Sequence, residues 1–347
     1  MNEDCLKLTS YFGERRRVGG KFAADALLDL YGRHEVATSI LLRGTEGYGD
    51  KHRLRTDMSL SLSEDLPLIA IAVDGWSRIE PLFDEARRLT GSGLVTLEGA
   101  RLLTGDIQPM VLPSDREDDD TKLTVYLGRQ ERVYRVPAFV AVCDLLRRRG
   151  VAGATALLGV DGTVNGKRER AAFFGRNADV PMMIIAVGSG SSIGRVLPEL
   201  GGLLRRPLLS LEGVRVCKRD GHLLGSPGDL PTADEAGRPL WHKLMLYTSE
   251  AATQGGQPVH RAIVRRLRAA GVGGATTMRG VWGFHGDHQP HGDKLLQFGR
   301  RVPAVTTVID TPERIATAFG IIDDLTSGQG LVSCETVPAV APVRLAA

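Results

Sequence analysis

Lys7-Leu-Thr-Ser-Tyr-Phe-Gly-Glu14 opens a pattern that the chain repeats twice more. The stretch returns as Lys122-Leu-Thr-Val-Tyr-Leu-Gly-Arg129 and again as Lys243-Leu-Met-Leu-Tyr-Thr-Ser-Glu250, at spacings of 115 and 121 residues. Self-similarity at a nearly constant spacing is the signature of tandem structural units. The 347 residues are therefore expected to fold as repeated modules of about 100 residues each.

Further landmarks follow the opening stretch in the same order in every copy. They are Val36-Ala-Thr, Val151-Ala-Gly and Val272-Gly-Gly, then Asp65-Leu-Pro67, Asp179-Val-Pro181 and Arg301-Val-Pro303, then Val95-Thr-Leu-Glu98, Leu209-Ser-Leu-Glu212 and Val332-Ser-Cys-Glu335. We predict three modules at residues 5–104, 120–218 and 241–338. An acidic, proline-containing linker at 105–119 and a Gly- and Pro-rich linker at 219–240 would join them.

Hydrophobic periodicity indicates the same order of elements in each module. In copy one, alternation begins a strand at Leu6, helical spacing follows from Phe22 to Tyr31, and Thr38–Leu42 forms a second strand. A third strand region is interrupted near Pro67, which we expect to mark an edge or a bulge. A second helix and a last strand near Leu94–Leu97 complete the order β-α-β-β-α-β. This order predicts an α+β, ferredoxin-like fold, with two helices on one face of a four-stranded antiparallel sheet.

The ordered landmarks resemble the nitrogen-regulatory PII superfamily of signalling proteins. More specifically, they are similar to three tandem copies of the PII-like family called domain of unknown function 190. The resemblance rests on Lys7-Leu-Thr, Val36-Ala-Thr, Arg43-Gly-Thr-Glu-Gly-Tyr-Gly49, Asp65-Leu-Pro67 and Gly93-Leu-Val-Thr-Leu-Glu98. It implies a trimer-forming fold, and three modules in one chain are expected to pack around a pseudo-threefold axis. The sequence leaves open whether the modules close on one another or pair with a second chain as a homo-oligomer.

The resemblance also implies a function, that of a non-enzymatic regulatory protein. PII proteins bind adenine nucleotides between subunits and relay binding to enzymes or membrane transporters. Two Gly-containing loops would meet a small anionic ligand here, because glycines let backbone amides approach a phosphate and arginines neutralise it. The expected ligand-binding residues are Arg43, Gly44, Gly47, Gly49, Thr90, Gly91, Ser92 and Gly93 in copy one, and Arg279, Gly280, Gly283, Thr326, Ser327 and Gly328 in copy three.

Copy two departs from this pattern. It has Leu203-Leu-Arg-Arg-Pro207 where copy one has Thr90-Gly-Ser-Gly93, and its interval from Gly162 to Pro181 is one residue shorter than in the other copies. We therefore expect copy two to have lost a ligand site.

Three other functions are compatible with parts of the sequence. A ligand-free protein-interaction scaffold would use the same loops as contact surfaces. His285, His288 and His291 lie close together and suit a Zn²⁺, Ni²⁺ or Cu²⁺ site. Gly190-Ser-Ser192-Ile-Gly194 matches the G-x-S-x-G pattern of serine hydrolases, with Asp220 and His222 as the nearest acid and base. The aligned segments of the other copies indicate an ordinary helix start at that position.

Composition excludes several classes of protein. Apolar residues make up 42% of the chain and charged residues 24%, which is globular composition. The net charge of +3 gives no support to a nucleic-acid partner. Apolar runs such as Met182–Val187 are far shorter than the roughly 20 residues of a membrane span, and the four scattered cysteines suit a reducing compartment. We therefore expect a cytoplasmic protein that is not embedded in a membrane.

Overall fold

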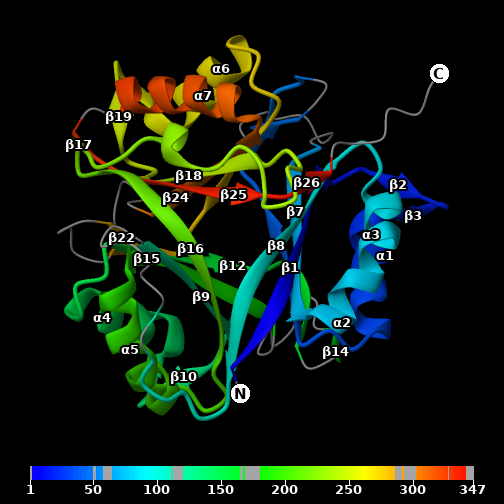
Figure 1. Cartoon of the computed structure of the whole chain (residues 1–347), viewed down its shortest axis with the longest axis vertical. Helices are drawn as coiled ribbons and strands as arrows, with labels where there is room; N and C mark the ends of the chain where they lie inside the picture. The colour runs from blue at the N-terminus through cyan, green and yellow to red at the C-terminus, as the bar shows by residue number, and fades with distance from the viewer. Residues whose placement is uncertain are drawn as a thin grey trace.

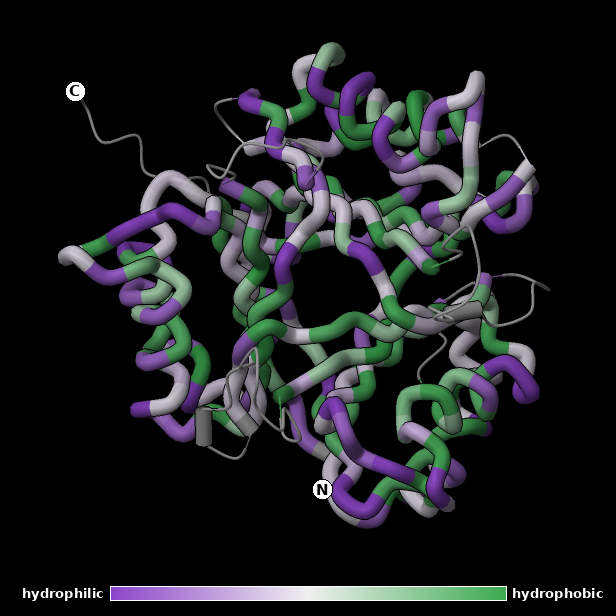
Figure 2. Tube along the Cα trace, turned by 180° about the vertical axis from the view of Figure 1, so that it is seen from behind, coloured by the Kyte–Doolittle hydropathy of each residue, from purple (hydrophilic) through white to green (hydrophobic). Residues whose placement is uncertain are grey.

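The computed structural model describes residues 2–49, 52–57, 65–110, 112, 120–164, 167–168, 180–285, 291–292, 302–326 and 328–340. Three repeated units of strands and helices surround the middle of the molecule. Their helices lie outermost and their strands innermost (Figure 1). The same three groups are seen from behind, around a central set of strands (Figure 2). The chain is therefore an α+β protein made of three repeated modules.

Each module has the order β-α-β-β-α-β, with short additional strands in its loops. Module 1 consists of β1 (Asn2–Gly13), β2 (Arg17–Val18), β3 (Lys21–Phe22), α1 (Ala23–Arg33), β4 (Thr38–Arg43), β5 (Glu46–Tyr48), β6 (Arg55–Thr56), β7 (Pro67–Gly75), α2 (Trp76–Ile79), η1 (Glu80–Leu82), α3 (Phe83–Thr90) and β8 (Leu94–Thr104). Module 2 consists of β9 (Asp120–Gly128), β10 (Arg132–Val133), β11 (Val136–Pro137), α4 (Ala138–Arg148), β12 (Gly153–Leu158), β13 (Asp161–Val164), β14 (Lys167–Arg168), β15 (Pro181–Ser189), α5 (Gly190–Leu203) and β16 (Leu208–Arg219). The second linker carries β17 (His222–Leu223) and η2 (Pro227–Asp229). Module 3 consists of β18 (Trp241–Ser249), β19 (Thr253–Gln254), β20 (Gln257–Pro258), α6 (Val259–Ala269), β21 (Ala275–Arg279), β22 (Trp282–His285), β23 (His291–Gly292), β24 (Pro303–Asp310), α7 (Pro312–Leu325), β25 (Leu331–Val337) and β26 (Ala339–Val340).

Four long strands of each module form an antiparallel sheet with one shared order. The orders are β4-β7-β1-β8, β12-β15-β9-β16 and β21-β24-β18-β25. Pro67 was expected at an edge or a bulge, but it is the first residue of β7, a strand that lies between β4 and β1. A proline at the first position of a strand does not interrupt the ladder, which explains why a central strand tolerates it.

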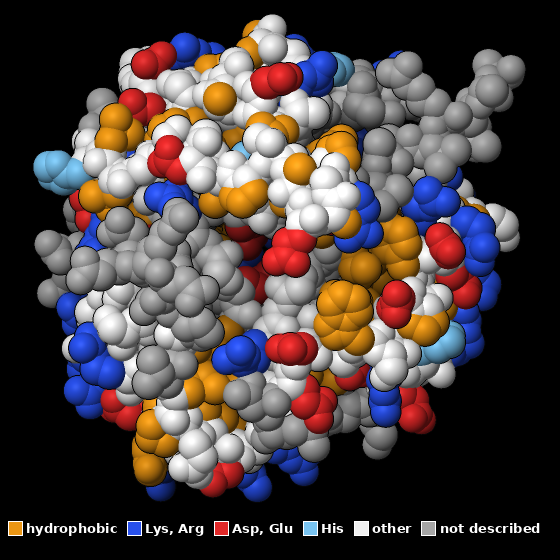
Figure 3. Space-filling view, viewed as in Figure 1, with side chains coloured by type: hydrophobic (Ala, Val, Ile, Leu, Met, Phe, Trp, Pro, Cys, Tyr) orange, Lys and Arg blue, Asp and Glu red, His pale blue; other side chains and the backbone are white. Residues whose placement is uncertain are grey.

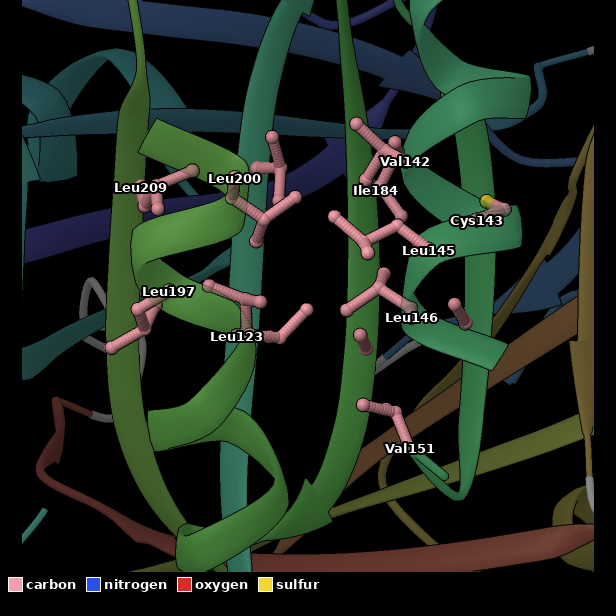
Figure 4. Packing of buried hydrophobic residues seen from close by; sticks show 14 of the residues in the cluster. Leu123, Val142, Cys143, Leu145, Leu146, Val151, Ile184, Leu197, Leu200 and Leu209 are labelled. Atoms are coloured by element: carbon pink, nitrogen blue, oxygen red, sulfur yellow. The ribbon is translucent and has the colours of Figure 1, made fainter. Parts of the chain in front are cut away.

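Apolar side chains of the helices pack onto the outer face of each sheet. In module 2, Leu197 and Leu200 of α5 and Val142 and Leu146 of α4 lie over the strands that carry Leu123, Ile184 and Leu209 (Figure 4). Equivalent clusters fill modules 1 and 3. A fourth cluster takes residues from all three modules, including Ile71, Met183 and Val305. The inner faces of the three sheets therefore pack against one another and form one common core.

Hairpins after the second long strand close the modules into a ring. The hairpin strand β5 of module 1 pairs with β21 of module 3, β22 of module 3 pairs with β12 of module 2, and β13 of module 2 pairs with β4 of module 1. Each hairpin thus adds a strand to a different neighbour, and the third pairing closes the cycle.

The last strands make a second cycle. β16 pairs with the end of β8 through Leu208–Leu211 and with the start of β25 through Arg215–Arg219, while β26 pairs with the start of β8. The last strand of module 1 was expected near Leu94–Leu97, but β8 continues to Thr104, because its second half pairs with module 2. In the described part of the chain, no helix is long and apolar enough to cross a membrane.

Candidate functional site

Six charged side chains meet where the inner faces of the three sheets come together. Lys7, Lys122 and Lys243 come from the first strands β1, β9 and β18, and Glu98, Glu212 and Glu335 come from the last strands β8, β16 and β25. All six are buried, with at most 7% of each residue exposed. In each module the lysine lies directly opposite the glutamate of the same module in the antiparallel ladder. We call these six residues the Lys–Glu ring.

The ion pairs of the Lys–Glu ring form a closed cycle. Lys7 contacts Glu98 at 2.7 Å and also Glu212 of module 2. Lys122 contacts Glu212 at 3.3 Å and Glu335 of module 3 at 2.5 Å. Lys243 contacts Glu335 at 3.1 Å and Glu98 of module 1 at 2.9 Å. Each ammonium therefore bridges its own module to the next, and three cations balance three anions.

The charged states of the ring stabilise one another. Burial alone would lower the pKa of Lys7, but the carboxylates of Glu212 and Glu98 raise it above its usual value. The same balance raises the pKa of Lys243. Burial opposes ionisation of Glu98 as well, but the ammonium groups of Lys243 and Lys7 hold its pKa well below the usual range. At Lys122 burial outweighs the carboxylates of Glu212 and Glu335 and lowers the pKa.

Carboxylate oxygens of Glu98, Glu212 and Glu335 lie within 4.8 Å of one another, a spacing that a metal ion could bridge. Each of these carboxylates already contacts two ammonium groups of the ring, so a metal ion that bridged all three would have to displace lysines. Tyr11 and Tyr247 follow the lysines on the inner face, and burial raises the pKa of Tyr11 to about 12. The ion pairs of the ring therefore join the inner faces of the three modules.

Five of the predicted glycines, Gly44, Gly47, Gly49, Gly280 and Gly283, belong to the hairpins of modules 1 and 3. A Cβ atom at Gly47 would lie 2.5 Å from the carbonyl oxygen of Ala275, and one at Gly283 would lie 2.3 Å from that of Ala154. Gly44 and Gly280 would likewise meet the threonine side chains or backbone of β21 and β12. Gly49 is open, with no heavy atom within 4 Å of an added Cβ. These close approaches give four of the five glycines a structural reason to lack a side chain.

The two predicted arginines are each held by a carboxylate. Arg43 donates from Nε and Nη2 to Glu14 at 2.9 Å. Arg279 donates from Nε to Glu250 at 3.0 Å, and its Nη2 lies 3.4 Å from Asp57 of module 1. The equivalent positions of module 2 hold Leu158 and Arg129, so the arginine and its carboxylate are absent together there. Module 2 therefore differs from the other two modules at both positions of this pair.

The residues predicted before the last strands β8 and β25 contact side chains and backbone other than Arg43 and Arg279. Thr90 donates to the carbonyl of Ala86, and Gly91 ends α3 with φ +69° under the guanidinium of Arg16. Gly93 approaches the backbone of Tyr11, beside Ser92.

In module 3, Thr326 is buried and donates to the carbonyl of Ile322. Its hydroxyl also accepts from Lys218 of module 2 at 3.3 Å, and Lys218 contacts Asp323 as well. Gly328 is exposed, and Ser327 lies outside the described residues. The loop of module 3 therefore meets a buried cation from its neighbour.

The metal and hydrolase candidates are only partly described. His285 is buried in β22, whereas His288 and the side chain of His291 lie outside the described residues. Ser192 lies in the first turn of α5, where its hydroxyl donates to the carbonyl of Ser189 at 2.9 Å and its backbone N–H donates to the Ser189 hydroxyl. These are the contacts of a helix N-cap.

The Lys–Glu ring was not predicted, although the sequence contains a pattern that indicates it. The three lysines and three glutamates occur at the same place in every copy and served only as landmarks for the repeats. A lysine at an inward position of a strand is unusual, and an acidic residue at an inward position of the paired strand is its natural partner. The threefold recurrence of both could have predicted the ring.

Comparison with known proteins gives the family. A family model for DUF190, described as "Uncharacterized ACR, COG1993", matches residues 5–102, 120–216 and 241–339. A UPF0166 protein of Aquifex aeolicus (strain VF5) is 28% identical over 97 residues, which cover 28% of this chain and 90% of that protein. A crystal structure of aspartate kinase from Synechocystis matches at a TM-score of 0.25 and 10% identity, over 96% of this chain and 44% of that one, too low a score to bear on the fold. The chain belongs to the DUF190 family and carries three tandem copies of its domain.

Proposed function

We propose that this chain is a non-enzymatic, PII-like regulatory protein whose three modules stand in for the three subunits of a trimer. In this proposal it binds a small anionic ligand, an adenine nucleotide by analogy, at a junction between modules. Binding is then passed to a partner protein or a membrane transporter. The observation that carries the proposal is the double cycle of strand pairing, in which every hairpin and every last strand ends on a neighbouring module.

Two further features support it. The strand order β4-β7-β1-β8, with two helices in the order β-α-β-β-α-β, supports the proposed ferredoxin-like, PII-like module. Arg279 contacts carboxylates from two different modules, Glu250 and Asp57. A phosphate could take the place of these carboxylates, because it offers the guanidinium the same bidentate acceptors with more charge. Release of Asp57 would loosen the hairpin of module 1, and that change is a signal that a partner could read.

The test is nucleotide binding by isothermal titration calorimetry with ATP, ADP and AMP. The double variant Arg43→Ala/Arg279→Ala should weaken binding at least tenfold, because each charge-assisted pair is worth about 1.5–3 kcal/mol. Glu250→Gln should tighten binding, since it removes a competing carboxylate. Arg33→Ala, which removes an exposed ion pair with Glu85 on helices α1 and α3, is the matched control. Equal nucleotide affinity in the double variant and the control would refute the site, and no binding to any nucleotide would refute the ligand.

The carboxylates on both arginines favour one alternative, a protein-interaction scaffold that takes no small ligand. In that case the hairpins act only as contact surfaces for a protein partner and as links between the three modules. A variant in which residues 52–57 are replaced by a short glycine linker would then lose its protein partner, while every nucleotide leaves the melting temperature unchanged. A ligand at 100 times its Kd adds about 2.7 kcal/mol of stability, so its effect would be visible in the same assay.

A further inference from the structure

A pocket of about 580 Å³ opens on the face of the molecule where the first strands begin. It is lined by β1 and β8 of module 1, β9 and β16 of module 2, β25 of module 3 and single leucines of both linkers. On this face, acidic side chains lie deep in the hollow at the middle (Figure 3). The pocket therefore belongs to no single module, and it leads down to the Lys–Glu ring.

The floor of the pocket includes Glu212 and Glu335 of the ring, whereas the three lysines are absent from its lining. A ligand in the pocket would meet acceptors for hydrogen bonds before it met any cation of the ring.

One floor oxygen lacks a partner among the described residues. Glu212 is 5% exposed and uses Oε1 for both of its lysines, so its buried Oε2 accepts no hydrogen bond. The other two glutamates differ. Glu98 also accepts from Thr96 at 2.7 Å, and both oxygens of Glu335 contact Lys122 at 2.5 Å.

The hydroxyl two residues before the glutamate has different partners in modules 1 and 2. Ser210 stands in module 2 where Thr96 stands in module 1, and its hydroxyl lies 3.4 Å from the phenol of Tyr126. Glu212 is therefore left without the donor that Glu98 receives. A buried carboxylate oxygen without a partner costs about 1–3 kcal/mol or more, so a donor that reached it from the pocket would be strongly favoured.

The charges that line the pocket are balanced. The ionisable side chains that line the pocket are Asp4, Asp120, Glu212, Glu335, Arg101 and Arg215. Arg215 lies 3.8 Å from Asp229, and Asp120 accepts the backbone N–H of Val216 at 3.0 Å. Lysines of the ring balance Glu212 and Glu335, and Asp4 and Asp120 equal the two arginines in number, so the unpartnered oxygen of Glu212, and not net charge, is what favours a donor here.

The outer part of the pocket is apolar. Trp76, which is 51% exposed, and Leu112 and Leu230 of the linkers lie along it. An exposed indole beside two leucines offers a surface for methylene groups and a ring face for a cation. Acceptors on the floor and apolar side chains at the mouth suit a molecule with a charged end and a hydrocarbon body.

We propose that this pocket is a binding site for a small organic cation that carries a primary ammonium or guanidinium group. The cationic end donates to Oε2 of Glu212, and the hydrocarbon part lies against Trp76. This site is distinct from the hairpin arginines and goes beyond the proposed nucleotide function. It would let the ring of modules sense a second, oppositely charged ligand.

The test is calorimetric titration of the full chain with putrescine, agmatine and spermidine. Glu212→Gln should weaken binding about 10- to 100-fold, since a charged hydrogen bond becomes a neutral one. Because this variant also alters the Lys–Glu ring, a second variant leaves the ring intact. Gly213 lines the pocket and an added Cβ there meets no heavy atom within 4 Å, so Gly213→Phe adds a large side chain at the pocket wall and should weaken binding strongly.

Gly202→Phe is the matched control, because an added Cβ on this glycine of α5 is equally free and lies outside the pocket. Absence of binding by all three amines at millimolar concentration would overturn the proposal. So would binding that Gly213→Phe leaves at the strength of the Gly202→Phe control. ATP affinity, which depends on Arg43 and Arg279, should be the same in Gly213→Phe and Gly202→Phe, so failure of one site is distinguishable from failure of the other.

Discussion

The Lys–Glu ring and the hairpin junctions join the same three modules by opposite means. In the ring, contact is made by long charged side chains that are identical in every copy. At the junctions, contact depends on having no side chain, because Gly47, Gly162 and Gly283 each lie against a carbonyl of the neighbour. All three copies therefore share two features, the charged residues of the Lys–Glu ring and the glycines of the hairpin junctions.

The positions beside the glycines differ between copies. Glu46, Asp161 and Trp282 precede the three junction glycines, although all three take part in the same kind of strand pairing. A buried charge in the ring must keep its partners, whereas a residue beside a backbone pairing is free to change. The ring therefore fixes the assembly, and the junctions are where the three modules acquire different properties.

The largest effect is expected from breaking the ring. Lys7→Met leaves Glu98 and Glu212 with one ammonium fewer in a buried site, which should cost about 3–5 kcal/mol of unfolding free energy. Urea unfolding at neutral pH measures this loss. The double variant Lys7→Met/Glu212→Gln removes one charge of each sign and should be more stable than Lys7→Met alone. A loss below about 1 kcal/mol in the single variant would mean that the ring does not hold the modules together.

A smaller loss is expected at a junction. Gly47→Ala places a Cβ atom 2.5 Å from the carbonyl oxygen of Ala275, so β5 must move away from β21. Overpacking of this kind costs about 1–3 kcal/mol. Gly49→Ala is the control, because its Cβ meets nothing within 4 Å, and it should leave the midpoint of urea unfolding unchanged. If the two variants unfold at the same urea concentration, the close approach at Gly47 is not what requires glycine.

The repeat and its elements could be predicted from the sequence because they depend on local periodicity. Alternation at Leu6 and helical spacing between Phe22 and Tyr31 correspond to β1 and α1. The far end of β8 could not be predicted, because Arg101–Thr104 are strand residues only through their pairing with module 2. Strand pairing between modules depends on how the modules pack together, and no local pattern within one copy predicts it.

Less of the candidate site than of the fold could be predicted from the sequence. Gly47 and Arg279, two of the residues predicted to bind a ligand, both contact a neighbouring module. Their interpretation as a phosphate cradle rested on the resemblance and stays a prediction. The carboxylates on Arg43 and Arg279 were missed, because Glu14 and Glu250 are distant in sequence and only the folded sheet brings them together.

A pH-dependent effect should distinguish the junction of modules 1 and 3 from the ring. Burial raises the pKa of Glu46 to about 7, against the opposing charges of Arg261 and Arg265. The folded chain therefore keeps a proton that the unfolded chain loses near pH 4.5, so this residue lowers stability as the pH rises from about 4.5 to 7. Glu46→Gln should gain about 1–2 kcal/mol at pH 8 and nothing at pH 4, after a discount for screening by the two arginines.

Thermal melts of Glu46→Gln and the parent chain between pH 4 and 8 measure this difference. The exposed residue Glu80 gives the control variant Glu80→Gln, whose melting temperature should follow the parent at every pH. A constant difference between Glu46→Gln and the parent across this range would show that Glu46 is ionised in the folded state.

The smallest effect is expected from an ion pair outside both regions. Arg33 of α1 and Glu85 of α3 lie 3.3 Å apart with their side chains 61% and 40% exposed. The chemistry is that of the ring, a cation beside a carboxylate, but water solvates both groups in the folded and the unfolded chain alike. Arg33→Ala should therefore cost less than about 1 kcal/mol, and added salt should reduce even that. The loss from Lys7→Met should depend far less on salt, because burial shields the ring from ions. If added salt reduced the loss of unfolding free energy equally in Lys7→Met and Arg33→Ala, water and ions would have to reach the Lys–Glu ring. The contrast between a buried set of ion pairs and an exposed pair would then be wrong.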